Sequence, residues 1–143
     1  MTLQIMRRAG AVALLGVGAV HLQQYLTGYD VLPTIGTLFL LNAISAGVVG
    51  FALLLPVERL FGERVVGLLA LGAVAIAIGS LISLFIAETS ILFGFSEDGY
   101  DTPVVIAIAT EVATVVLLAP VAVANVVRGV SARGGGGALT SAR

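Results

Sequence analysis

The 143-residue sequence contains no cysteine, one histidine and two methionines. The absence of cysteine excludes disulfide bonds, thiolate metal sites and cysteine nucleophiles. His21, Met1 and Met6 offer too few ligands for copper, zinc or a bis-histidine haem within one chain. The net charge of −1 argues against nucleic acid as a partner. We therefore expect neither a haem nor a metal centre held by this chain alone, and no nucleic-acid partner.

Charged residues are also scarce, at 10% of the chain, while hydrophobic residues make up 59%. A soluble domain is typically about a quarter charged, because its surface must face water. This chain has too little polar surface to cover a core of its own, so lipid must cover it. The composition therefore predicts an integral membrane protein with the lipid bilayer as its partner, and 143 residues leave room for one domain.

Long apolar runs are what the sequence does contain. A bilayer-spanning helix needs roughly 20 mostly apolar residues, and four segments meet this requirement. The sequence thus predicts an all-α fold, a four-transmembrane-helix bundle. The bundle occupies residues 1–128, with helices at about 6–27, 34–55, 64–92 and 103–127.

The ends of these segments carry recognisable signals. Thr102 followed by Pro103 predicts an N-cap and a proline at the first helical position of the fourth helix. Residues 129–143 are rich in glycine and serine, so we expect a disordered cytoplasmic tail. The first segment has an alternative interpretation as a cleaved signal peptide, since Arg7 and Arg8 precede a short apolar run. No small-x-small cleavage site sits cleanly after that run, so we expect the helix to remain.

The arginines predict the orientation. All of them fall near the chain termini or between the second and third segments. The other two connections have no basic residue, and their charged residues are all acidic. By the positive-inside rule, both termini should face the cytoplasm of a bacterial plasma membrane that the chain crosses several times. The arginines are Arg7, Arg8, Arg59, Arg64, Arg128, Arg133 and Arg143, and the acidic residues of the other connections are Asp30, Glu97, Asp98 and Asp101.

Small residues predict where the helices pack. Helices in lipid associate through close contact between small side chains. One such face is expected on the second helix and one, at four-residue spacing, on the third. The two faces are Ala43, Ala46, Gly47 and Gly50, and Ala75, Gly79 and Ser83.

Polar residues recur at one depth in the half of the bundle predicted to face outward. At about 1.5 Å per residue, His21, Asn42 and Glu111 lie roughly 10–12 Å inward from the outer ends of their helices. A carboxylate at this depth is costly unless it is paired, protonated or hydrated, so Glu111 is a functional candidate. We therefore predict an outward-facing polar pocket. Its candidate ligand-binding residues are His21, Tyr25, Asn42, Ser83, Glu88 and Glu111.

The same residues have a structural interpretation. Asn42 and Ser83 are typical of hydrogen bonds between membrane helices, and Glu88 is typical of the membrane interface. His21 is expected to form a hydrogen-bonded pair with Glu111, which is compatible with a buried core histidine as well as with a ligand site. The sequence leaves these alternatives open.

The segment HLQQYLTGYDVLPTIGTLFLLNAISA resembles a group of small four-helix bacterial integral membrane proteins. That group has a His-Leu-x-x-Tyr segment, an Ile/Leu-Pro-x-Ile-Gly turn and a Leu-Phe-Leu-Leu-Asn/Gln run. An FGF sequence and an acidic residue precede its fourth helix, as residues 93–95 and Glu97 do here, and a glutamate inside that helix matches Glu111. The resemblance covers about half the chain and implies a fold, not an activity. In helix count the chain also resembles the DoxX-like quinone-linked membrane proteins.

Three hypotheses for the function follow. In the first, the pocket binds a small ligand or a quinone, and the protein is an accessory subunit of a larger membrane complex. In the second, buried carboxylates serve a proton-coupled transporter that works as a homo-oligomer. In the third, His21 and Glu111 act as acid and base of an intramembrane enzyme on a lipid, although no nucleophile or metal motif supports it. We favour a non-enzymatic function.

Overall fold

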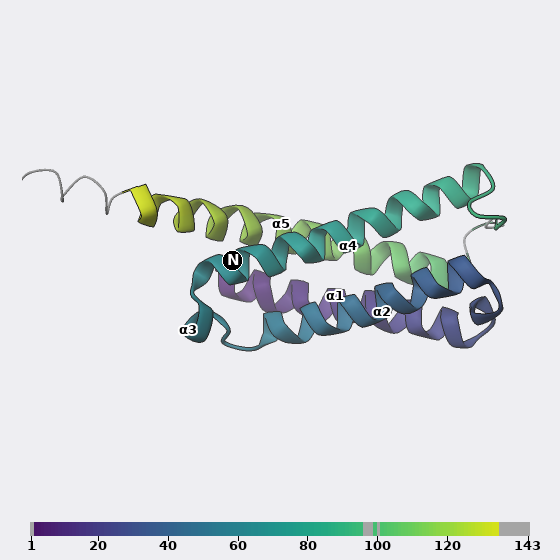
Figure 1. The fold of residues 1–143 in the computed structure, drawn as a ribbon, viewed down its shortest axis with the longest axis horizontal. Helices are drawn as coiled ribbons and strands as arrows, with labels where there is room; N and C mark the ends of the chain where they lie inside the picture. The colour runs from purple at the N-terminus through teal and green to yellow at the C-terminus, as the bar shows by residue number, and fades with distance from the viewer. Residues whose placement is uncertain (1, 96–98, 100, 135–143) are drawn as a thin grey trace, which may run out of the picture.

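Four long antiparallel helices make up the fold (Figure 1). The computed structural model describes residues 2–95, 99 and 101–134. Its elements are α1 (Leu3–Leu26), the 3₁₀ helix η1 (Tyr29–Val31), α2 (Pro33–Leu54), the short α3 (Glu58–Phe61), α4 (Glu63–Thr89) and α5 (Thr102–Gly134). The N-terminus and α3 lie at one end of the bundle, called here the N-terminal end, and the α1–α2 and α4–α5 connections lie at the other (Figure 1). The predicted all-α, four-helix architecture is confirmed.

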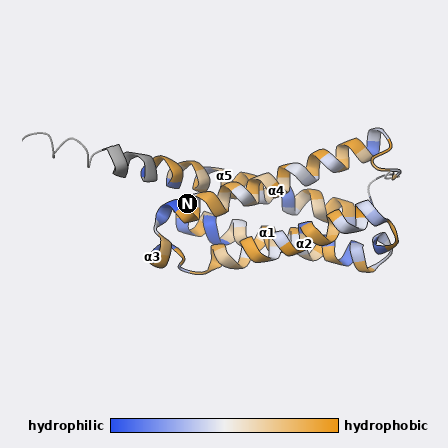
Figure 2. Ribbon diagram, in the orientation of Figure 1, coloured by the Kyte–Doolittle hydropathy of each residue, from blue (hydrophilic) through white to orange (hydrophobic). Residues whose placement is uncertain are grey.

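The outer surface of the bundle is apolar over the length of the helices. All four long helices are long and apolar enough to cross a membrane. Large side chains such as Val48, Phe51 and Phe85 are more than half exposed. Figure 2 shows apolar residues over the helices and many of the hydrophilic ones towards the two ends. Since an apolar surface of this extent belongs in lipid, the fold is that of a small multi-pass membrane protein.

The fourth helix differs from its predicted limits at both ends. Asp101, not Thr102, caps its start, because the Val104 amide donates a hydrogen bond of 3.0 Å to the Asp101 carboxylate. At the other end α5 continues to Gly134, so residues 129–134 are helical and not part of a disordered tail. Extending a formed helix fixes one residue for each hydrogen bond gained. The rest of the predicted tail, residues 135–143, lies outside the described residues, as do Glu97 and Asp98.

The helices surround a core that is concentrated in the N-terminal half. α1 packs along α2 and α5, and α4 packs along α5, while α2 and α4 meet over a shorter stretch. Ala11, Leu14 and Leu118 are fully buried where α1 meets α5. A Cβ atom added at Gly67 would lie 3.1 Å from the Val126 backbone nitrogen, so α4 and α5 are in close contact there. Small residues therefore do bring helices together, as expected in lipid.

The small-residue face predicted on α2 is confirmed at Ala46 and Gly50, although a Cβ atom added at Gly47 would meet no described atom within 4 Å, and the face predicted on α4 is not confirmed. On α2, Ala46 and Gly50 are buried, and a Cβ at Gly50 would lie 2.8 Å from the Leu15 side chain. On α4, however, Gly79 is exposed, and an added Cβ would meet no described atom of the neighbouring helices within 4 Å. The predicted packing face through Gly79 is therefore wrong. The residues of α4 that pack are Val66, Gly67, Ala70, Ala73 and Ala77, on a different side of the helix.

One ion pair fastens the N-terminal end. The Arg7 guanidinium donates a 2.7 Å hydrogen bond to the Glu58 carboxylate, which links α1 to α3. Arg7 is 7% exposed, and its Nε atom has no hydrogen-bond partner among the described residues. This hydrogen bond lowers the pKa of Glu58 below its ordinary value of 4.5. A second pair, Arg128 with Glu63 at 3.6 Å, is well exposed.

Candidate functional site

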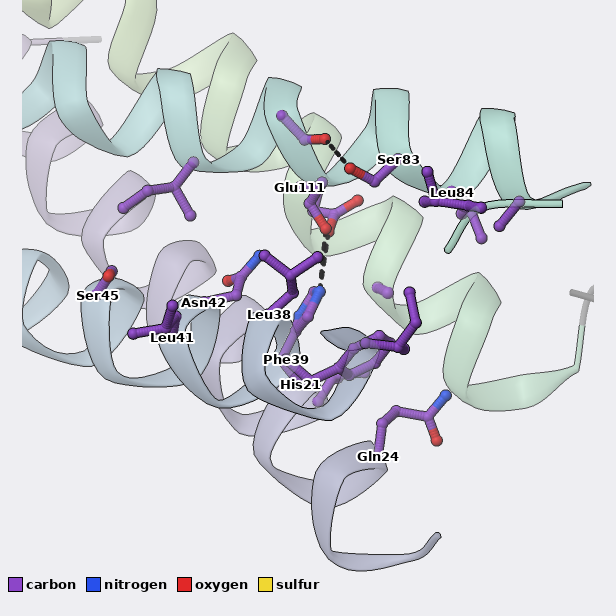
Figure 3. Close-up of a pocket in the computed structure, with 18 of the residues that line it drawn as sticks. His21, Gln24, Leu38, Phe39, Leu41, Asn42, Ser45, Ser83, Leu84 and Glu111 are labelled. Carbon is purple, nitrogen blue, oxygen red and sulfur yellow. Dashed lines mark hydrogen bonds and ion pairs between the residues drawn. The ribbon is translucent and has the colours of Figure 1, made fainter. Parts of the chain in front are cut away.

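A cavity of about 390 Å³ lies between α1, α2, α4 and α5, in the half of the bundle away from the N-terminus. This volume falls within the usual range for small-molecule sites, about 300–1,000 Å³. Most of its lining is apolar, and its polar groups converge from four helices (Figure 3). The polar side chains that line it are His21 and Gln24 of α1, Asn42 and Ser45 of α2, Ser80 and Ser83 of α4, and Glu111 of α5.

His21 is held in one orientation by two hydrogen bonds. Its Nδ1 atom lies 2.9 Å from the Val17 carbonyl oxygen, and its Nε2 atom lies 3.0 Å from the Ser80 hydroxyl. A carbonyl oxygen only accepts, so Nδ1 carries a proton. In the neutral ring, Nε2 then accepts a hydrogen bond from Ser80. The contact between His21 and Ser80 joins α1 directly to α4, and the imidazole faces the cavity (Figure 3).

Glu111 is the most buried polar group of the site. It is 1% exposed, and neither carboxylate oxygen has a hydrogen-bond partner among the described residues. His21 Nε2 is 3.8 Å from Glu111 Oε1, which is close enough for an ion pair when the imidazole is protonated but too far for a hydrogen bond. Ser80, which is hydrogen-bonded to His21, lies close to the Glu111 carboxyl group. The two side chains point towards each other (Figure 3), so the predicted proximity of His21 and Glu111 is confirmed, whereas the predicted direct hydrogen bond is absent.

Asn42 and Ser83 also line the cavity. The Asn42 side-chain oxygen is buried and has no hydrogen-bond partner among the described residues. Ser83 instead donates a hydrogen bond of 2.9 Å to the Gly79 carbonyl oxygen of its own helix (Figure 3). Ser83 therefore does not hold two helices together, and the interhelical role that the sequence left open for it is not what the structure shows.

Tyr25 and Glu88, the other two candidate residues, do not line the cavity. With 3.6 residues per turn, positions three and four after His21 lie on either side of it, and the structure turns Gln24 rather than Tyr25 inward. The same geometry turns Ala87 towards the cavity in place of Glu88. Glu88 is half-buried, and its Oε1 atom has no hydrogen-bond partner among the described residues. The depth of a residue along its helix does not show which side of the helix it lies on, so depth alone could not exclude Tyr25 and Glu88.

An aromatic cluster that the sequence did not single out covers the end of the cavity nearest the α1–α2 and α4–α5 connections. Phe39 lies 5.1 Å from the His21 ring, between ring centroids, and stacks on Tyr29 at 4.7 Å. Tyr29 in turn meets the edge of Phe95 at 5.4 Å. Phe39 and Phe95 line the cavity. These rings come from η1, α2 and the α4–α5 connection, so only the folded chain brings them together.

The end of the cavity that faces the N-terminal half of the bundle is closed by packed side chains. Leu14, Val17 and Leu118 are fully buried below it. Thr114, one turn below Glu111, is also fully buried, and its hydroxyl donates a hydrogen bond of 2.8 Å to the Thr110 carbonyl oxygen. A second cavity, of about 360 Å³, lies at the N-terminal end, lined in part by Arg7, Glu58, Glu63, Asn125 and Arg128.

Comparisons of the chain with protein-family models, curated proteins and solved structures found no match. The resemblance to small four-helix bacterial membrane proteins therefore stays a prediction. Within the described part of the chain, no group of three or more histidine, aspartate or glutamate side chains is placed to hold one metal ion. The polar groups that line the cavity are hydrogen-bond donors and acceptors.

Proposed function

We propose that this protein binds a small amphipathic molecule, with a quinone as the leading candidate, in the cavity between its four long helices. The observation that supports this most directly is Glu111, a fully enclosed carboxyl group at the edge of an open space, with no hydrogen-bond partner for either oxygen among the described residues. Buried polar groups are nearly always hydrogen-bonded, and an exception calls for an explanation. A polar ligand head group in the cavity would supply the missing partner.

The surrounding groups suit such a head group. His21 and Ser80 lie next to Glu111 and are linked by a 3.0 Å hydrogen bond. Asn42 adds a buried side-chain oxygen without a partner among the described residues. These groups include both donors and acceptors, so they fit a molecule whose polar end carries carbonyl or hydroxyl oxygens. A quinone and its reduced form carry such oxygens, and Glu111 would then exchange a proton with the bound ring.

The transporter hypothesis has less support than ligand binding. A transport pathway must connect the two sides of the membrane. Here the fully buried Leu14, Val17 and Leu118 separate the cavity from the second cavity at the N-terminal end. A polar cavity that is closed on one side favours holding a ligand over passing one through.

Native mass spectrometry of protein extracted in detergent tests the proposal even though the ligand is unidentified. The parent should carry a small-molecule adduct, which solvent extraction and fragmentation then identify. In Glu111→Leu, the affinity should fall about tenfold, because a lost hydrogen bond contributes about 1.4 kcal/mol, and the fraction of protein that carries the adduct should fall with it. If neither protein carries an adduct in the mass spectrum, or if both carry the same adduct to the same extent, the proposal is wrong. The spectra also show whether a second copy or another membrane protein stays bound, as the predicted homo-oligomer or larger complex requires.

The orientation is part of the same proposal. We place both termini in the cytoplasm of a bacterial plasma membrane, and hence the cavity in the outer half of the bilayer. The arginine distribution supports this, since Arg7, Arg59, Arg64 and Arg128 belong to the N-terminal end of the bundle. Reporters inserted at Gly99 should be accessible from outside the cell, and reporters at Gly62 only from inside. Reversed accessibility would move the cavity to the inner leaflet.

A further inference from the structure

The walls of the cavity are not equally closed. Val20, Ile35 and Val104, which line it from α1, α2 and α5, are buried. Leu38 and Leu41 of α2, however, line the cavity while being 44% and 54% exposed. Gly79 and Ser83, on the α4 side, also line the cavity and are exposed. A residue that both lines a cavity and is exposed lies at its opening, so the opening is between α2 and α4.

The other routes to the cavity are covered. The Tyr29, Phe39 and Phe95 rings pack together over the end near the chain connections. Leu14 and Leu118 fill the bundle on the opposite side. α2 and α4 are also neighbours that meet over only a short stretch, unlike α4 and α5. The opening therefore lies on a side of the bundle, where the membrane-spanning helices face acyl chains.

Small side chains on α4 leave room at this opening. Ala75, Gly79 and Ser83 follow one another at four-residue spacing, and all three line the cavity. A Cβ atom added at Gly79 would meet no described atom of another helix within 4 Å. From Ala75 to Ser83 the opening extends for about 12 Å along the helix, at about 1.5 Å per residue. Behind it lies the carboxyl group of Glu111, which is buried and has no hydrogen-bond partner among the described residues.

We infer that the cavity opens sideways into the bilayer between α2 and α4, and that its ligand is a membrane-dissolved amphiphile with an apolar tail. This inference rests on the proposed function and adds a route and a ligand class to it. The polar head lies against His21, Ser80 and Glu111, and the tail lies in the opening, against Leu41 and Gly79. Such a molecule never has to leave the lipid to reach the site, so a covered outer end is no obstacle.

Spin labelling tests the opening directly, because the sequence has no cysteine and each single-cysteine variant carries one label. Ser83→Cys places the label at the opening. Gly72→Cys is the lipid-facing control on the same helix, since Gly72 also has open space around it but does not line the cavity. Ser90→Cys, at the exposed end of α4, is the water-facing control. Each labelled protein is placed in lipid nanodiscs, and collisions with oxygen and with a water-soluble nickel chelate are measured.

The label at position 83 should collide with oxygen and be shielded from the nickel chelate, as at position 72. Decylubiquinone, an amphiphile with one tail, should then lower the oxygen collision rate at position 83 by about threefold, because a bound ligand buries most of the surface it contacts. The rate at position 72 should not change. A label at position 83 that prefers the nickel chelate, as at position 90, would show an opening to water and overturn the inference. Magnetic coupling between labels of two copies would overturn it as well, since a second chain would then cover the opening.

Failure of this inference is distinguishable from failure of the proposed function. The oxygen and nickel collision rates are measured without ligand, so they report on the opening even if mass spectrometry finds no adduct. An adduct in a protein whose opening faces water would keep the binding proposal and remove the lateral route. A lipid-facing opening that decylubiquinone does not protect would contradict the placement of the tail.

Discussion

Gly10 and Gly67, in the N-terminal half of the bundle, differ from Gly79, beside the cavity, in the space around them. In the N-terminal half, a Cβ atom at Gly10 would lie 2.5 Å from the Leu118 side chain, and one at Gly67 would lie 3.1 Å from the Val126 backbone. In the cavity half, a Cβ atom at Gly79 would meet no described atom of another helix within 4 Å. Glycine thus lets helices approach closely at Gly10 and Gly67 and leaves space beside the cavity at Gly79.

The buried charged groups differ between the two halves in the same way. At the N-terminal end, Arg7 is paired with Glu58 at 2.7 Å. In the cavity, Glu111 is 3.8 Å from His21 and lacks any hydrogen bond among the described residues. Arg7 has its carboxylate partner at hydrogen-bond distance, whereas a buried carboxyl group without a hydrogen bond is a cost that a purely structural role does not explain. This contrast supports our proposal that Glu111 binds a ligand.

The largest expected effect is on helix packing. Gly67→Leu should destabilise the protein by about 3 kcal/mol, because its side chain has no room between α4 and α5. Gly79→Leu makes the same change on the same helix where space is open, and should alter stability by about 0.5 kcal/mol or less. Unfolding in mixed detergent micelles measures both. Equal losses would mean that the two halves of α4 are packed alike.

The second effect concerns the ion pair at the N-terminal end. Glu58→Gln should lower stability by about 1–2 kcal/mol, less than for a fully buried pair because Glu58 is partly exposed. The matched change Glu63→Gln, in an exposed pair with Arg128, should cost about 0–1 kcal/mol.

The loss of stability in Glu58→Gln should also depend on pH. The folded-state pKa of Glu58 is lowered below 4.5 by Arg7, so the stabilisation is fully present above that value. It is lost as the pH falls through the lowered pKa, where parent and Glu58→Gln should become equally stable. Unfolding measured from pH 7 downward follows the difference between them, and a difference that persists or grows in acid would contradict the assignment.

The sequence was sufficient for the fold and for part of the site. Four apolar segments of bilayer length predicted α1, α2, α4 and α5, because lipid allows few alternatives to a helix. Counting residues inward from the helix ends brought His21, Asn42, Ser83 and Glu111 to one depth, and all four line the cavity. Depth along a helix can be read from sequence because the rise per residue is constant.

Rotation about the helix axes was harder to predict, since most faces of these helices are apolar. For this reason the spacing of small residues predicts a packing face through Gly79, which is exposed, and depth alone does not show that Gln24 rather than Tyr25 lines the cavity. The aromatic cluster of Tyr29, Phe39 and Phe95 depends on how two chain connections fold over α2. Spacing along the sequence carries no signal for that arrangement.

The smallest expected effect is the most informative about the cavity. Glu111→Leu removes a buried carboxyl group that makes no hydrogen bond with the described residues, and leaves a side chain of similar size. The free energy of unfolding should therefore stay the same or rise by about 1 kcal/mol, because the variant no longer has to bury a polar group without a hydrogen bond. Ser80→Ala, one contact away, should instead cost about 1 kcal/mol, since it breaks the 3.0 Å hydrogen bond to His21. Unfolding in mixed micelles compares the two with the parent. A loss in Glu111→Leu as large as in Ser80→Ala would make Glu111 a structural residue, and the case for a ligand at its carboxyl group would fall with it.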